Sequence, residues 1–165
     1  MPKPQRKSVI LDTCFLVTLY NDTYPLHAIA KQYYEYFIDN DIFMHIPAIV
    51  VEEYEIKEPI DAIEATGNFI IGMPYGRDDA KKAAEFKNKL SAVGRGSTSK
   101  DAVSNDIKLL AQATNNDITY FITTDETLKN HCEFLNTSGD SKTIPIFADN
   151  YDESIFNGGQ LALGV

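Results

Sequence analysis

The sequence has little cysteine and no long apolar run, and each absence excludes a broad class of protein. Its two cysteines, Cys14 and Cys132, form no disulfide framework and lack the spacing of a thiolate metal site. No apolar run approaches the roughly 20 residues that span a bilayer, so we expect no membrane partner. The lead from Met1 to Lys7 passes into a short apolar run that ends at Asp12, which is unlike a signal peptide. The expected location is therefore a reducing cytoplasm.

Positive charge is also scarce. The chain carries 15 Lys and Arg residues against 24 Asp and Glu residues, a formal net charge of −9. Phosphate contacts need Lys and Arg, so this balance argues against a general nucleic-acid binder. The basic residues cluster in 1–7 and 81–100. The second cluster forms either a phosphate-contacting rim or a solvated helix face. Bound cations can neutralise part of the excess acid.

Hydrophobic periodicity predicts strands that alternate with helices. The length of 165 residues, with 44% hydrophobic and 24% charged residues, suits one soluble globular domain. The expected strands are 8–11, 42–46, 118–122 and 143–147, with a short edge strand or extended link within 68–75. The expected helices are 13–17, 25–39, 47–56, 60–66, 77–93, 100–114 and 126–134. This order implies a single three-layer α/β/α domain with a mainly parallel central sheet, followed by a mobile tail from 157 onward.

Two aspartates follow predicted buried strands. Asp12 ends the apolar run 8–11, and Asp125 comes shortly after the run 120–122. Open α/β sheets place their ligands at the carboxyl ends of such strands. Asp is also a common helix N-cap, and for Asp12 a cap without further function is the alternative.

Two further acids lie on predicted helices. Asp106 falls about 60° from the middle of the apolar stripe on helix 100–114, at the edge of the buried face. Glu53 lies beside the apolar face of the helix that begins at Pro47, whereas Glu52 points further round and is the weaker candidate. For both Glu52 and Glu53 the alternative is an ordinary surface glutamate.

The four acids are expected to meet, because the loops at the carboxyl ends of a right-handed α/β sheet converge on one edge. Four carboxylates without a basic partner repel one another unless divalent cations lie between them. Oxygen ligands favour Mg²⁺ or Mn²⁺ over zinc, and such ions bind phosphates and activate water. The residues therefore predict metal-dependent phosphate chemistry.

Four segments resemble the signature blocks of the PIN-domain ribonucleases, in the right order and at fitting separations. They are Val9–Thr13, Ile46–Glu53, Asn105–Ala113 and Phe121–Asp125. Residues 69–90 also resemble the strand and alanine-rich helix that precede the third block. The resemblance covers 7–149, which we take as a PIN-like nuclease domain between a basic N-terminal lead, 1–6, and a C-terminal extension, 150–165.

The resemblance implies a PIN-like fold that binds Mg²⁺ or Mn²⁺ and hydrolyses RNA phosphodiester bonds as an endoribonuclease. Carried over residue by residue, the acidic metal ligands are Asp12, Glu53, Asp106 and Asp125. Thr123 matches the family's hydroxyl position, which orients a carboxylate or a water molecule.

Two nearby residues are less firmly placed. The spacing of six residues from Pro47 favours Glu53 over Glu52 as the ligand. Asp101 fits a helix-capping pattern with Thr98 better than it fits the site.

The resemblance also suggests partners. Small stand-alone PIN domains often act as the toxin of a toxin–antitoxin pair, so an antitoxin protein and a second copy of the chain join RNA as expected partners. Cys14 stands where the family usually has Asn, Ser or Thr, which favours the alternative of a catalytically weak PIN-like domain that binds RNA or protein. A receiver-type signalling domain is disfavoured, because the paired acidic motif after the first strand and the lysine after the last are not evident.

Overall fold

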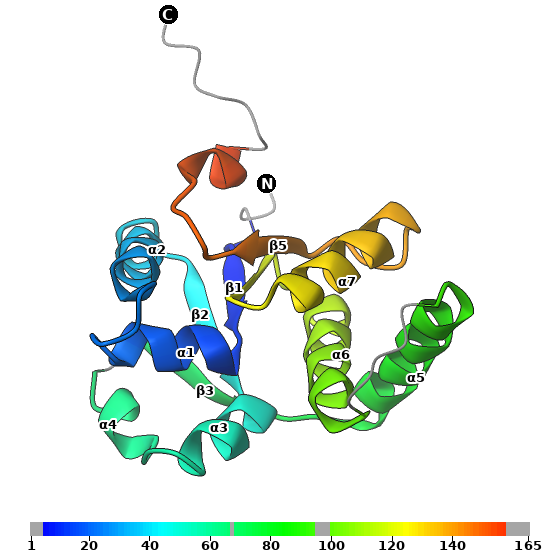
Figure 1. Ribbon diagram of the computed structural model, residues 1–165, viewed down its shortest axis with the longest axis horizontal. Helices are drawn as coiled ribbons and strands as arrows, with labels where there is room; N and C mark the ends of the chain where they lie inside the picture. The colour runs from blue at the N-terminus through cyan, green and yellow to red at the C-terminus, as the bar shows by residue number, and fades with distance from the viewer. Residues whose placement is uncertain (1–4, 67, 95–99, 158–165) are drawn as a thin grey trace, which may run out of the picture.

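A computed structural model describes residues 5–66, 68–94 and 100–157, apart from the side chains of 100–104 (Figure 1). Its centre is a five-stranded sheet in the order β3-β2-β1-β4-β5, in which every neighbouring pair of strands is parallel. The strands are β1 (Ser8–Leu11), β2 (Phe43–Pro47), β3 (Phe69–Met73), β4 (Tyr120–Thr123) and β5 (Ile144–Phe147). Of the two alternatives predicted for the segment within 68–75, an edge strand and an extended link, the edge strand is correct.

Helices cover both faces of this sheet. They are α1 (Thr13–Tyr20), α2 (His27–Asp39), α3 (Ala48–Glu55), α4 (Asp61–Glu64), α5 (Arg77–Ala92), α6 (Lys100–Asn115), α7 (Glu126–Thr137) and the 3₁₀ helix η1 (Glu153–Asn157). Figure 1 shows α1 and α2 on one side of the sheet and α5 and α6 on the other. The predicted three-layer α/β/α domain is confirmed. Within the described residues, no helix is long and apolar enough to cross a membrane.

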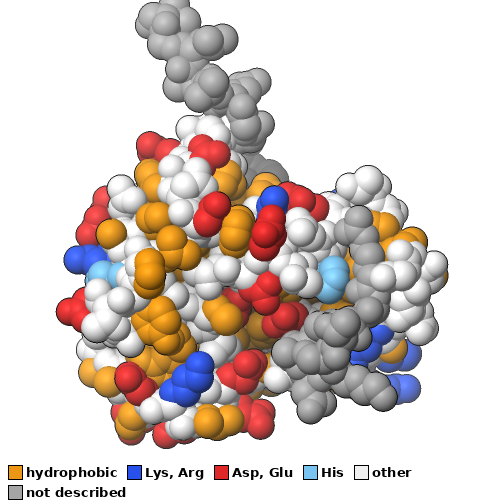
Figure 2. All heavy atoms as spheres, in the orientation of Figure 1, with side chains coloured by type: hydrophobic (Ala, Val, Ile, Leu, Met, Phe, Trp, Pro, Cys, Tyr) orange, Lys and Arg blue, Asp and Glu red, His pale blue; other side chains and the backbone are white. Residues whose placement is uncertain are grey.

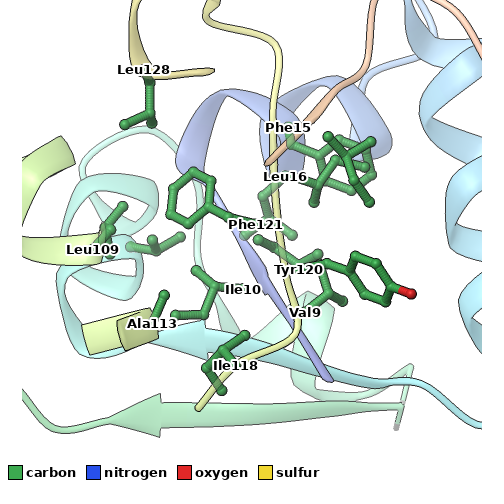
Figure 3. Packing of buried hydrophobic residues seen from close by; sticks show 14 of the residues in the cluster. Val9, Ile10, Phe15, Leu16, Leu109, Ala113, Ile118, Tyr120, Phe121 and Leu128 are labelled. Atoms are coloured by element: carbon green, nitrogen blue, oxygen red, sulfur yellow. The ribbon is translucent and has the colours of Figure 1, made fainter. Parts of the chain in front are cut away.

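The two central strands are buried on both faces. Val9 pairs with Tyr120, and Ile10 pairs with Phe121 in parallel register, so each pair points to the same face. Figure 3 shows Val9 and Tyr120 on the side of α1, and Ile10 and Phe121 on the side of α6. All four side chains are at most 2% exposed. Such doubly covered strands read as continuous apolar runs, which is why β1 and β4 were predictable.

Helix α6 is buried more completely than its pattern predicted. The expected stripe comprised Val103, Ile107, Leu110, Ala111 and Thr114. The structure also buries Leu109 and Ala113, which are 1% and 0% exposed. The reason is that α6 packs between the sheet and α5, so a second face of the helix is covered (Figure 1).

Several predicted boundaries are wrong, among them the ends of α1 and α7, which run to Tyr20 and Thr137 rather than to 17 and 134. The last central strand begins at Tyr120 rather than Ile118 and ends at Thr123. Ile118 instead closes the end of α6, donating its N–H to the carbonyl of Ala113 at 2.9 Å after Asp117 adopts a positive φ of 51°. Helix α2 begins at His27 rather than Pro25, because residues 21–26 form a turn.

The segment after β5 folds back onto an aromatic cluster. The hydroxyl of Tyr33 donates to the carbonyl of Asn150 at 2.8 Å. Phe156, in η1, is 5% exposed and stacks on Tyr36 with ring centroids 4.0 Å apart, while Tyr120 meets its ring edge-on. Residues 150–157 therefore add to the core. Asn157, which was predicted to begin a mobile tail, belongs to η1, and the rest of that tail lies outside the described residues.

Replacing Phe156 with alanine should lower the free energy of unfolding by about 3 kcal/mol, because it removes a buried ring from this cluster. Chemical denaturation measures the change. The matched control is Phe43→Ala, since Phe43 is 39% exposed. Equal losses in the two variants would show that the C-terminal segment does not contribute to the core.

Candidate active site

Asp12 and Asp125 each follow a central strand and cap the next helix. Asp12 Oδ1 accepts from the backbone N–H of Cys14 at 2.9 Å, at the start of α1. Asp125 Oδ1 accepts from the backbone N–H of Thr127 at 2.8 Å, at the start of α7. Asp12 is therefore a helix N-cap. A carboxylate has about four lone-pair sites, so a cap leaves it able to bind something else.

Thr123 connects these two aspartates. It is the last residue of β4 and is fully buried. Its hydroxyl donates to Asp12 Oδ2 and accepts from the backbone N–H of Asp125, the latter at 2.9 Å. Thr123 therefore lies beneath the site and fixes the positions of both aspartates, while Thr124 lines the site itself.

The structure brings all four predicted acids to one pocket of about 590 Å³ at the carboxyl end of the sheet. They come from the end of β1, from α3, from α6 and from the loop after β4, and they are Asp12, Glu53, Asp106 and Asp125. Figure 2 shows acidic side chains gathered near the middle of this face. Glu52 is exposed on α3 and does not line the pocket. Asp101 belongs to the part of α6 whose side chains are not described.

The pocket makes ionisation of three of its acids unfavourable. Burial, together with the smaller effects of the charges of Asp12, Asp125 and Glu53, raises the pKa of Asp106 to about 7. Burial is also the main reason that the pKa of Asp12 is raised to about 6, despite its hydrogen bonds to Thr123 and Cys14. The pKa of Glu53 is raised by burial as well. Raised carboxyl pKa values in a cleft are typical of functional sites, and a cation placed among these acids would reverse the effect.

The donor set fits a hard divalent ion. All four acids offer oxygen, the ligand that Mg²⁺ and Mn²⁺ prefer. The hydroxyl of Thr13, a further pocket residue that is 7% exposed, is buried without a hydrogen-bond partner of regular geometry. Among the described residues, no three His, Cys, Asp or Glu side chains are gathered closely enough to hold an ion as they stand. Ion binding would therefore require the carboxylates to draw together.

Part of the pocket lining is apolar, and this apolar wall was not predicted. It is formed by Val17, Tyr24, Pro25 and Leu26. Lys57 also lines this pocket and is the one Lys or Arg among the described residues that do so. The charge of Lys57 lowers the pKa of Glu53. The sequence predicted that a helix starts at Pro25. It did not indicate that Tyr24 and Pro25 lie in a turn and line the pocket.

Cys14 gives a test of ion binding that does not depend on catalysis. It lines the pocket, and burial together with the charges of Asp12, Asp106 and Asp125 raises its pKa to about 12. We expect iodoacetamide to alkylate Cys14 at pH 8 at least roughly tenfold more slowly than an unperturbed thiol, because the thiolate is the reactive form. Adding Mg²⁺ should speed the reaction by offsetting the aspartate charges.

Mass spectrometry of the Cys14 peptide measures this rate. Cys132 is buried and provides an internal reference in the same sample. An alkylation rate that is unchanged by millimolar Mg²⁺ would contradict binding of the ion beside Cys14.

Comparison with known proteins supports the fold assignment. No protein-family model and no curated protein matches the sequence. Among solved structures, VapBC2 from Rickettsia felis, bound to a DNA fragment from its promoter, is similar with a TM-score of 0.58 at 15% identity, covering 88% of this chain and 99% of that chain. FitAcB from Neisseria gonorrhoeae is similar with a TM-score of 0.56 at 13% identity, covering 85% of this chain and 97% of that chain. The chain has the PIN-like three-layer α/β/α fold.

Proposed function

We propose that this chain is a metal-dependent endoribonuclease that hydrolyses RNA phosphodiester bonds with Mg²⁺ or Mn²⁺. The observation that carries the proposal is the meeting of four acids, from four separate parts of the chain, in one pocket of a PIN-like fold. The raised pKa values of Asp12, Glu53 and Asp106 show that their ionisation is unfavourable without a nearby positive charge, which a cation would supply. The pocket also lies where parallel α/β sheets bind ligands.

Each residue has a distinct task in this proposal. Asp12, Glu53, Asp106 and Asp125 would hold the cation, which supplies the charge that binds a scissile phosphate and activates water. Thr123 is a positioning residue, because it hydrogen-bonds to Asp12 and to the backbone of Asp125. The helix caps made by Asp12 and Asp125 orient these carboxylates before substrate arrives.

Incubation of the purified chain with 3′-labelled single-stranded RNA tests the activity. We expect internal cleavage in Mg²⁺ or Mn²⁺, no cleavage in EDTA, and products that carry a 5′-phosphate. Binding of RNA without cleavage in either metal would instead favour the catalytically weak binding module, the alternative that Cys14 raises.

The biological role we propose is that of the toxin in a toxin–antitoxin pair. Its support is the likeness to VapBC2 and FitAcB, which are toxin–antitoxin complexes. The proposed partners are RNA, an antitoxin protein and a second copy of this chain. Expression of the chain should then stop bacterial growth, whereas Asp12→Ala should not, and a small neighbouring reading frame should restore growth and co-purify with the chain. Normal growth on expression of the intact chain would count against the toxin role but not against the nuclease.

A further inference from the structure

The pocket is lined by acids and also by an exposed aromatic ring. Tyr24 is 43% exposed and lines the pocket together with Pro25 and Leu26. Figure 2 shows hydrophobic side chains exposed beside the acidic cluster. We propose that the ring of Tyr24 stacks on one unpaired base of the RNA, next to the phosphate held at the acids. This inference rests on the proposed function and specifies the substrate as single-stranded.

The loop that carries Tyr24 is held in place before any ligand binds. Asn21 Oδ1 accepts from the backbone N–H and the hydroxyl of Thr23, at 3.1 and 2.6 Å. The backbone N–H of Tyr24 donates to the carbonyl of Asn21 at 3.2 Å, and its own carbonyl accepts from the N–H of His27 at 3.1 Å. The His27 ring is 3.0 Å from the carbonyl of Thr18, which ties the start of α2 to α1. The backbone of this loop is thus fixed while the Tyr24 ring remains exposed, and such preorganisation reduces the entropy lost on stacking.

Lys57 supplies positive charge in the same pocket. It follows the end of α3, where its backbone N–H donates to the carbonyl of Tyr54 at 2.9 Å, and its side chain is exposed. A ligand that satisfies a cation held by the acids, Lys57 and the Tyr24 ring together carries phosphate and a flat base, which describes a nucleotide and, under the proposed function, a nucleotide of an RNA strand. Base stacking on an aromatic ring is open to single strands, whereas the bases of double-stranded RNA are already stacked and paired.

Binding measured without turnover tests the inference. The parent protein is the Asp106→Asn variant in Mg²⁺, and the probe is a fluorescent single-stranded RNA 12-mer followed by anisotropy. We expect Tyr24→Ala to weaken binding about tenfold or more and Tyr24→Phe to change it less than about twofold, because stacking needs the ring and not the hydroxyl. Phe43→Ala is the matched control, since Phe43 has a similar exposed fraction of 39%. Phe43 lies at the amino end of β2, whereas the pocket lies at the carboxyl end of the sheet.

A single abasic residue moved along the RNA identifies the base that stacks. At one position, the abasic residue should weaken RNA binding by the parent protein about as much as Tyr24→Ala weakens binding of the intact RNA. At the same position, it should not weaken RNA binding by the Tyr24→Ala variant any further. Lys57→Gln should reduce the slope of log affinity against log salt by about one. Unchanged affinity in Tyr24→Ala, or equal abasic effects in both proteins at every position, would overturn the inference.

Cleavage by the protein with Asp106 intact, assayed in parallel, separates the two proposals. Cleavage that Tyr24→Ala leaves unchanged, in both KM and preference for single strands, overturns the stacking inference and leaves the nuclease standing. Absence of both cleavage and RNA binding in the unmodified protein overturns the proposed function and the stacking inference with it.

Discussion

Replacing Asp12 or Asp125 with asparagine should reduce RNA cleavage about a thousandfold while the protein stays folded. Asparagine caps helices as well as aspartate does, so the hydrogen bonds to Cys14 and Thr127 can persist. Both substitutions remove the negative charge that would bind the cation, and at Asp12 the acceptor for the Thr123 hydroxyl is lost as well. A bound ion contributes several kcal/mol to the stability of the transition state. Gel-based rates in Mg²⁺ and Mn²⁺, together with circular dichroism of each variant, measure the two effects.

The two neighbouring glutamates of α3 provide the matched control for this loss. Glu53 lines the pocket and Glu52 is exposed away from it. Glu53→Gln should be as inactive as Asp12→Asn, and Glu52→Gln should cleave at the rate of the unmodified protein. Equal activity in Glu52→Gln and Glu53→Gln, or full activity in Asp12→Asn, would contradict the assignment of the site.

The metal-free protein should lose about 4 kcal/mol of stability between pH 4 and pH 8 through Asp12 and Asp106. Their pKa values are raised from 3.8 to about 6 and about 7 in the folded state. A raised pKa means that the folded state holds the proton more tightly, so this stability is fully present below about pH 3.8 and is lost as the pH rises through 6 and 7. Each pKa unit is about 1.36 kcal/mol, and the figure is reduced because Asp106 is partly exposed to solvent.

Urea denaturation in EDTA at several pH values measures how the free energy of unfolding changes with pH. Asp106→Asn should be more stable than the unmodified protein at pH 8 by about 1–2 kcal/mol, since it removes a charge that the pocket disfavours. Replacing the exposed Asp39 with asparagine should have no such effect. Mg²⁺ should restore stability at pH 8 by binding the folded state. If the free energy of unfolding depends on pH in the same way in Asp106→Asn and in the unmodified protein, the surroundings of Asp106 do not disfavour its ionisation.

The central strands and the acids at their ends were predictable because each leaves a local signal. Continuous apolar runs mark β1 and β4, and Asp12 and Asp125 come directly or shortly after them. The edge position of Asp106 on its helix and the position of Glu53 beside an apolar face follow from helical geometry alone. The convergence of these acids follows from the rule that parallel strands present their carboxyl ends on one edge.

The apolar wall left no such signal, because it depends on how a turn is placed between two helices. Residues 21–26 fold back through hydrogen bonds of Asn21, and this brings Tyr24 to a pocket whose acids lie elsewhere in the sequence. The basic cluster 81–100 was predicted to form either a phosphate-contacting rim or a solvated helix face. On α5, Lys82 pairs with Glu85 and Lys89 pairs with Asp140, and among the described residues the one lysine that lines the pocket is Lys57.

Calorimetric titration with Mn²⁺ of the unmodified protein and its variants measures whether the four acids bind a cation. We expect saturable binding that is weakened at least about tenfold in Asp12→Asn and Asp106→Asn and is unchanged in Glu52→Gln. Equal Mn²⁺ affinity in all four proteins, or no binding to the unmodified chain, would contradict cation binding by these acids.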